Sequence, residues 1–175
     1  MTTATTAPNH LYLLIGSNQG DRAALLQQAT DLIRQRIGPV VRFSRRYETE
    51  PWGNFDNGAT PVQSFYNQAL LVHTTLTALE SLHEALAIEQ LLGRQRSPEA
   101  LGYTSRPIDI DLIFYNSEVV ESPELTLPHP RMHLRRFVLL PLCEIAPAYI
   151  HPLLHKNLQQ LTTECTDTCS CSCCA

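Results

Sequence analysis

Short apolar runs separated by turn residues alternate with helix-forming stretches along the chain. The apolar runs predict strands at residues 11–15, 40–47, 65–74 and 109–115. Helices are predicted at residues 21–37, where Asp21 is the N-cap, and at residues 77–92, where Thr77 and Glu80 form a capping box. A third, arginine-rich helix is predicted over residues 131–145.

The order of these elements predicts the fold class. Strand–helix–strand–strand–helix–strand is typical of an α+β protein with a ferredoxin-like βαββαβ sheet and helices on one face. An extra C-terminal helix and a hairpin follow it. We expect one domain at residues 10–161, between a disordered N-terminus at 1–9 and a disordered Cys-rich tail at 162–175.

Composition narrows the function classes. The 175 residues include 43% hydrophobic and 17% charged residues, as in ordinary globular proteins. No apolar run approaches the roughly 20 residues of a membrane span, and residues 1–10 lack the features of a signal peptide. We therefore expect a cytoplasmic protein without a membrane partner. The net charge of −4 disfavours general nucleic-acid binding, and without an apolar surface stripe we expect a monomer.

Cysteines gather at the end of the sequence. Cys143 lies in the predicted core, and the other five are Cys165, Cys169, Cys171, Cys173 and Cys174. A core without cysteine pairs fits a reducing compartment. The tail thiols could bind a soft metal, but their tight spacing matches no structural zinc pattern, so an incidental or accessory tail is favoured.

Two carboxylates interrupt the fourth apolar run. On a strand, Asp109 and Asp111 point to the same face, roughly 6.5 to 7 Å apart along the chain. Half-buried acids need a cation, which is either an arginine or a metal such as Mg²⁺ that bridges phosphates. Both interpretations remain open from this motif alone.

Arginines accumulate around the acidic strand. Lys156 is the only lysine, so the chain's cations are almost entirely guanidinium groups, which bind phosphate and carboxylate in planar, bidentate geometry. Six lie near the Asp pair: Arg94, Arg96, Arg106, Arg131, Arg135 and Arg136. This pattern predicts a local anion site, although ordinary surface charge is the alternative.

Six sequence blocks carry a family resemblance. They are Ile15-Gly16-Ser17-Asn18; Tyr47-Glu48-Thr49-Glu50-Pro51-Trp52-Gly53; Phe65-Tyr66-Asn67; Glu89 with Gly93-Arg94-Gln95-Arg96; Arg106-Pro107-Ile108-Asp109-Ile110-Asp111; and Pro128-His129-Pro130-Arg131 with Arg135-Arg136-Phe137. In this order they resemble the 6-hydroxymethyl-7,8-dihydropterin pyrophosphokinase family of folate biosynthesis. The resemblance implies a ferredoxin-like fold and transfer of the β,γ-diphosphate of ATP to the pterin hydroxymethyl group, with release of AMP.

The same resemblance implies roles for individual residues. Asp109 and Asp111 are expected to hold two Mg²⁺ ions that bridge ATP oxygens. The expected catalytic arginines, which reach over the triphosphate, are Arg94, Arg96 and Arg106. The expected ATP-binding residues are Glu89, His129 and Arg135. The expected pterin-binding residues are Thr49, Pro51, Trp52, Phe65, Asn67 and Phe137.

Each of these residues also has a plainer interpretation. The arginines after the second helix could complement its dipole, which contributes about 0.3 to 1 kcal/mol. His129 could be a simple loop histidine, and aromatic residues on a strand usually belong to the core. Asn67 is harder to explain this way, because an amide in an apolar strand needs a partner.

Some positions depart from the family pattern. Leu86 stands where members often have a glutamine near the nucleotide, Tyr103 takes the approximate place of a frequent tryptophan, and Thr104 replaces a usual glycine. The loops at residues 52–64 and 97–105 are longer than in compact bacterial members. We expect altered loop closure with the metal and phosphate chemistry intact.

Three other functions compete with this one. An RNA-binding module of the same strand order would need exposed aromatics in an RNP-type block and a basic face, which the sequence lacks. A two-metal nuclease would use paired acids, but the aromatic and amide residues favour a small flat substrate. A catalytically silent scaffold is disfavoured by the intact Asp pair. The expected partners are therefore ATP and the hydroxymethylpterin.

Overall fold

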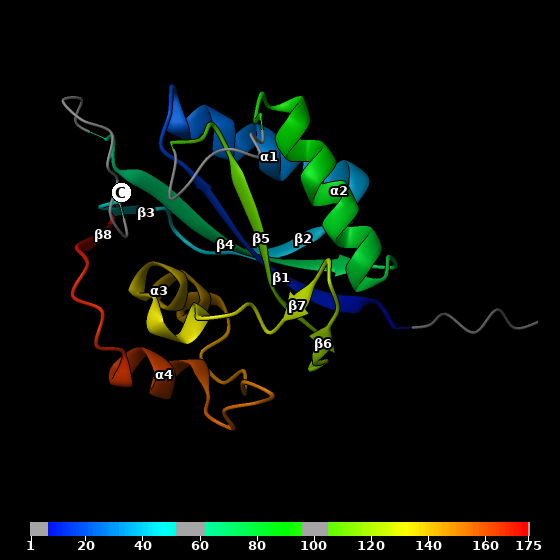
Figure 1. Ribbon diagram of the computed structural model, residues 1–175, viewed down its shortest axis with the longest axis vertical. Coiled ribbons are helices and arrows are strands. Elements are labelled where there is room, and N and C mark those ends of the chain that lie inside the picture. Colours follow the sequence, from blue (N-terminus) through cyan, green and yellow to red (C-terminus); the bar gives the residue numbers. More distant parts are fainter. Residues whose placement is uncertain (1–6, 52–61, 96–104, 175) are drawn as a thin grey trace, which may run out of the picture.

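The computed structural model describes residues 7–51, 62–95 and 105–174, which form an antiparallel sheet flanked by helices (Figure 1). Its strand order is β5-β1-β4-β3-β8, and β2 pairs with the remaining part of β4. The central strands are β1 (Asn9–Ser17), β4 (Phe65–Thr74) and β5 (Asp109–Tyr115). The short ones are β2 (Val40–Phe43), β3 (Tyr47–Thr49) and β8 (Cys171–Cys173).

Alternation along β1 gives the sheet two apolar faces. Leu11, Leu13 and Ile15 pack in one core cluster with residues of α1 (Arg22–Arg36) and α2 (Ala78–Leu91). Tyr12 and Leu14 pack in a second cluster with residues of α3 (Arg136–Ile145) and α4 (Leu158–Glu164). Figure 1 shows these helix pairs on opposite sides of the sheet. Each fully buried leucine contributes about 1.5 to 3 kcal/mol, so both layers stabilise the sheet.

Local caps place the first two helices as the sequence predicts. The Asp21 side chain accepts a hydrogen bond from Ala24 N at 3.0 Å. Thr77 and Glu80 form the expected capping box, with Thr77 Oγ1 accepting from Glu80 N and Glu80 Oε2 accepting from Thr77 N. These bonds satisfy amides that have no partner inside the helix.

A hairpin of β6 (Val120–Glu121) and β7 (Thr126–Leu127) follows β5.

Two sequence predictions need correction. The predicted strand at 40–47 is split into β2 and β3, because Ser44 turns inward and its hydroxyl accepts from Ala69 N at 3.0 Å. The predicted helix at 131–145 starts only at Arg136, after a 3₁₀ turn at Met132–Leu134. The helices α1 and α2 pack on one face of the sheet, and the C-terminal helices α3 and α4 fill the second face.

The C-terminal tail also departs from its prediction. We expected residues 162–175 to be disordered, but α4 extends to Glu164 and β8 pairs with β3. The physical reason is that the open edge of β3 offers backbone partners to a polar segment that has few apolar side chains to bury. Among the described helices, none is both long and apolar enough to span a bilayer.

Candidate active site

A pocket opens where β1, β3, β4 and β5 meet the start of α3. Eight of the predicted site residues line it: Thr49, Phe65, Asn67, Arg106, Asp109, Asp111, Arg135 and Phe137. Leu14, Gly16 and Glu50 complete the lining and had no predicted role. One cavity therefore joins the acidic pair to the aromatic and amide residues.

Asp109 is held by two arginines. Its Oδ1 accepts from Arg94 Nη1, and its Oδ2 lies 2.9 Å from Arg106 Nη2. Arg94 and Arg106 retain only 13% and 23% of their side-chain exposure, so these ion pairs are partly shielded from water. For Asp109, the simple arginine pairing that the sequence left open is therefore present.

Asp111 has a different environment. Among the described residues, its nearest basic partner is His129, whose Nε2 lies 3.9 Å from Asp111 Oδ1, beyond hydrogen-bond range. Burial lowers the pKa of His129, and Arg135 lowers it further, so both favour the neutral imidazole. Burial and the neighbouring Asp109 raise the pKa of Asp111. A carboxylate in this situation is stabilised by an additional cation.

The acidic pair fits Mg²⁺ in donor type and number. Both carboxylates face the same pocket, and oxygen is the ligand that Mg²⁺ prefers. In the part of the chain that the structure describes, no group of three His, Cys, Asp or Glu residues is gathered that could hold a metal. Two carboxylates are enough for Mg²⁺, which commonly takes its remaining ligands from water and substrate phosphates. The tail cysteines form no such group either.

Glu89 supports the acidic strand from behind. Its side chain on α2 is 1% exposed, and its Oε1 accepts from Ile110 N at 2.8 Å and from Arg94 Nη1 at 2.7 Å. Ile110 lies between the two aspartates, so Glu89 fixes both the backbone of the pair and one arginine that binds it. Glu89 does not line the pocket. Its position therefore suits orienting the site, and the direct ATP contact that the resemblance implied stays a prediction.

Aromatic and amide side chains line another part of the pocket. Asn67 is 4% exposed and donates from Nδ2 to Thr49 Oγ1 at 2.8 Å. The guanidinium carbon of Arg106 lies 6.0 Å from the Phe65 ring centroid, and that of Arg135 lies 5.9 Å from the Phe137 ring centroid. Phe65 and Phe137 therefore each lie beside an arginine that also lines the cavity. The aromatic slot thus adjoins the anion-binding side of the pocket.

Two residues of the first sequence block position the site, although we had assigned them no role. Asn18 is 1% exposed, and its Oδ1 accepts from Arg106 N at 2.8 Å, while its Nδ2 donates to Ser105 Oγ at 3.1 Å. Gly16 lies against the Asn67 amide, since a Cβ built on Gly16 would stand 2.6 Å from Asn67 Oδ1. A buried asparagine and a glycine inside a strand are the sequence signals that could have identified them.

Replacing Gly16 by alanine is expected to displace the Asn67 amide. The added Cβ meets the end of a side chain rather than backbone, so binding should suffer more than stability. We expect the KM for a pterin substrate to rise about tenfold, equivalent to about 1.4 kcal/mol, with the thermal midpoint nearly unchanged. Steady-state kinetics and a melting curve check this, and an unchanged KM would contradict it.

Some predicted residues cannot be placed. Trp52, Arg96, Tyr103 and Thr104 lie outside the described residues. Pro51 is described and follows Glu50, but it is not among the residues that line the pocket. Its predicted contact with a pterin stays a prediction, as do the direct ATP contacts of His129 and Arg94.

An acidic pair, convergent arginines and a flat slot in one pocket define an enzyme site for an anionic and a planar substrate. A family model described as 7,8-dihydro-6-hydroxymethylpterin-pyrophosphokinase matches residues 12–147. Similar proteins include the 2-amino-4-hydroxy-6-hydroxymethyldihydropteridine pyrophosphokinases of Porphyromonas gingivalis, 42% identical over 81% of this chain and 93% of that protein, and of Bacillus subtilis, 39% identical over 78% of each.

Solved structures agree on the fold. Wild-type HPPK-DHPS of Plasmodium falciparum, crystallised with pterin and p-hydroxybenzoate, superposes with a TM-score of 0.71 at 19% identity, over 93% of this chain. The present chain spans only 44% of that larger protein. The chain belongs to the 7,8-dihydro-6-hydroxymethylpterin-pyrophosphokinase family, as the family model and the relatives above 30% identity show.

Proposed function

We propose that this chain transfers the β,γ-diphosphate of ATP to the hydroxymethyl group of 6-hydroxymethyl-7,8-dihydropterin, giving the pterin diphosphate and AMP in folate biosynthesis. Family membership supports the reaction class. The observation that carries the proposal is the shared pocket, in which the carboxylate of Asp111 and the amide of Asn67 face one cavity. A flat substrate in the slot then presents its hydroxyl toward the acidic pair.

The reaction needs alignment and charge neutralisation more than a protein nucleophile. The hydroxymethyl oxygen attacks the β-phosphorus, the bond from that phosphorus to the α,β-bridging oxygen breaks, and this oxygen leaves with AMP while the hydroxyl proton passes to solvent. We propose that Asp109 and Asp111 hold two Mg²⁺ ions. When bound, these ions supply charge neutralisation for the phosphates and acidify the attacking hydroxyl.

The arginines of the pocket handle the polyphosphate. Arg106 and Arg135 line the cavity, so both can offer forked donors to phosphate oxygens. Arg106 also pairs with Asp109, which keeps the guanidinium oriented until a polyphosphate competes for it. We propose that Arg94 acts beside them, that His129 contacts ATP as a neutral donor, and that Arg96 joins them as the resemblance implies.

The slot selects the pterin. An amide offers a donor and an acceptor at fixed spacing, which matches the edge of a pterin, and Thr49 fixes the Asn67 amide through its hydroxyl. Phe65 and Phe137 supply apolar faces against which a planar ring packs. We propose that Thr49, Pro51 and Trp52 contribute the remaining wall, partly through backbone groups.

The finer points of organisation belong to the same proposal. The observed order β5-β1-β4 with β2 and β3 beyond β4 supports a ferredoxin-like classification with extra helices. We propose that residues 10–161 form the catalytic domain. A monomer in the cytoplasm, without nucleic-acid or membrane partners, stays our prediction.

The test is product identity. Purified protein with MgATP and 6-hydroxymethyl-7,8-dihydropterin is expected to form AMP and pterin diphosphate in equal amounts, resolved by ion-exchange chromatography. The 6-methyl analogue is the matched control, because it fits the slot but lacks the attacking hydroxyl, and it should give no AMP. Formation of ADP, or equal AMP with the analogue, would overturn the proposed reaction.

A further inference from the structure

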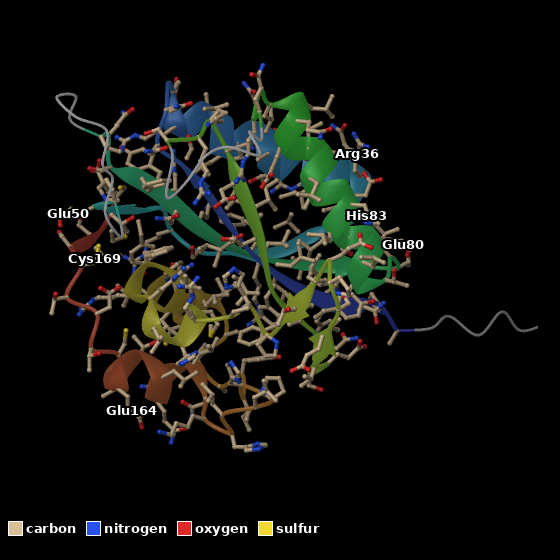
Figure 2. All side chains as sticks on the ribbon, in the orientation of Figure 1. Arg36, Glu50, Glu80, His83, Glu164 and Cys169 are labelled. Atoms are coloured by element: carbon tan, nitrogen blue, oxygen red, sulfur yellow. The ribbon has the colours of Figure 1, made fainter. Side chains whose placement is uncertain are left out.

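The segment that follows α4 connects two walls of the pocket. We name residues 167–174 the C-terminal strap. One end of the strap contacts the start of α3, and the other pairs with β3. Figure 2 shows Cys169 of the strap near Glu50, where β3 has just ended. The strap residues themselves do not line the pocket, but the strap contacts residues that do.

The strap pairs with all three residues of β3. Tyr47, Glu48 and Thr49 lie opposite Cys173, Ser172 and Cys171. Beyond the strand, Glu50 N donates to Ser170 O at 3.3 Å, and Cys174 N donates to Arg46 O at 2.8 Å. A strand of three residues has few bonds of its own, so this second row of bonds contributes much of its order. Thr49 and Glu50 form one wall of the pocket.

Asp167 ties the strap to the opposite wall. Its Oδ2 accepts from Arg136 N at 2.9 Å, and its Oδ1 accepts from Cys169 N at 3.0 Å. Arg136 is the first residue of α3, whose own N-cap residue makes no side-chain cap. The carboxylate therefore caps the helix and interacts favourably with its dipole. Arg135 and Phe137, the sequence neighbours of Arg136, both line the pocket.

We propose that the C-terminal strap sets the separation of the two pocket walls, with Asp167 and Ser172 as positioning residues for pterin binding. The strap joins Thr49 and Glu50 on one side to Arg135 and Phe137 on the other through bonds at both of its ends. Because a flat ring needs walls at a fixed spacing, release of either end should weaken pterin binding first. The inference rests on the proposed function for its kinetic consequence.

Proline substitutions in the full chain test the β3 end. In an antiparallel pair, alternate residues direct their N–H groups to the partner strand. Ser172 lies between Ser170 and Cys174, which both bond to the β3 side, so its N–H faces β3 and that of Cys173 faces away. Ser172→Pro therefore removes a pairing donor. Cys173→Pro is the matched control, because proline is tolerated on an edge strand where its missing N–H faces solvent.

The kinetic readout separates positioning from general destabilisation. For Ser172→Pro we expect the KM for the pterin to rise about tenfold, while the KM for ATP and the thermal midpoint change little. For Cys173→Pro we expect a pterin KM within about twofold of the parent value. An unchanged pterin KM would overturn the proposal. Parallel losses in both KM values and in the midpoint would also overturn it, because they would mean general unfolding.

A second pair of measurements keeps the inference independent of turnover. Amide hydrogen exchange in the peptide that contains Glu50 should accelerate at least about tenfold in Ser172→Pro and not in Cys173→Pro. Asp167→Ala should raise the pterin KM in the same way from the α3 end, with Asp31→Ala on the exposed side of α1 as its control. If the parent protein makes no pterin diphosphate, the proposed reaction is wrong. If amide exchange in the Glu50 peptide is unchanged in Ser172→Pro, the proposed positioning role of the strap is wrong.

Discussion

Exchanging Asp111 for asparagine is expected to lower kcat about a thousandfold, the equivalent of about 4 kcal/mol of transition-state stabilisation. The substitution keeps the shape of the side chain but removes the member of the acidic pair that forms no ion pair with an arginine among the described residues. Initial rates of AMP formation at saturating MgATP measure it. A variant that retains the parent rate would show that Asp111 holds no catalytic metal.

The same substitution should stabilise the metal-free protein. Burial and Asp109 raise the pKa of Asp111 to about 7. The folded state therefore loses stability as the pH rises from about 4 through 7 and this carboxyl becomes charged. In EDTA at pH 8, Asp111→Asn should gain on the order of 1 kcal/mol over the parent, a modest figure because 34% of the side chain is exposed. The gain should vanish at pH 4, as urea unfolding would show.

A surface substitution provides the matched control for this pair of effects. Asp31 lies on α1, is 51% exposed and pairs with Arg34. Asp31→Asn removes the same charge from a site remote from the pocket, so kcat should not change and stability should shift by less than about 0.5 kcal/mol at either pH. Equal stabilisation by both substitutions would mean that net charge, rather than the acidic pair, sets the pH dependence.

Replacing Arg94 by alanine is expected to produce the largest loss of stability, about 3 kcal/mol in the free energy of unfolding. The buried carboxylate of Glu89 loses its ion pair with Arg94, while its bond from Ile110 N remains. Turnover should fall as well, since Asp109 loses one of its two arginines. Chemical denaturation measures the first effect, and a variant as stable as the parent would contradict the buried pairing.

A double variant separates these two effects. Adding Glu89→Gln to Arg94→Ala removes the buried charge but keeps an oxygen for Ile110 N. Most of the lost stability should return, because burying an amide costs less than burying a carboxylate that has lost one of its ion pairs. Turnover should stay low, since the arginine is still missing. Recovery of both properties would mean that Arg94 has only a structural role.

Periodicity and caps predicted the central part of the fold. The limits of β4 and β5 coincide with the predicted runs, because long apolar runs between turn residues determine strands almost alone. Asp21 and Thr77 predicted the helix starts through bonds to residues three positions on. Local sequence was sufficient wherever the decisive contact was local.

Long-range contacts explain where the predictions failed. The tail has almost no apolar residues, so nothing in its sequence indicates that β8 would find an open strand edge. The support that Glu89 gives to the acidic strand was also not predicted, because its bond to a backbone amide 21 residues away cannot be inferred from the spacing of charges. By contrast, the shared orientation of Asp109 and Asp111 follows from strand geometry alone, and both line the pocket as expected.

Pairing of β3 with β8 has a consequence for the order of folding. The Cys169 thiol and the Glu50 carbonyl in contact there are 119 residues apart in sequence, so their meeting closes one of the longest loops in the protein. Contacts of such high separation form slowly and late. During synthesis on the ribosome, the edge of β3 stays open until β8 has emerged. We therefore expect a nascent chain to acquire its central sheet well before its substrate slot is complete.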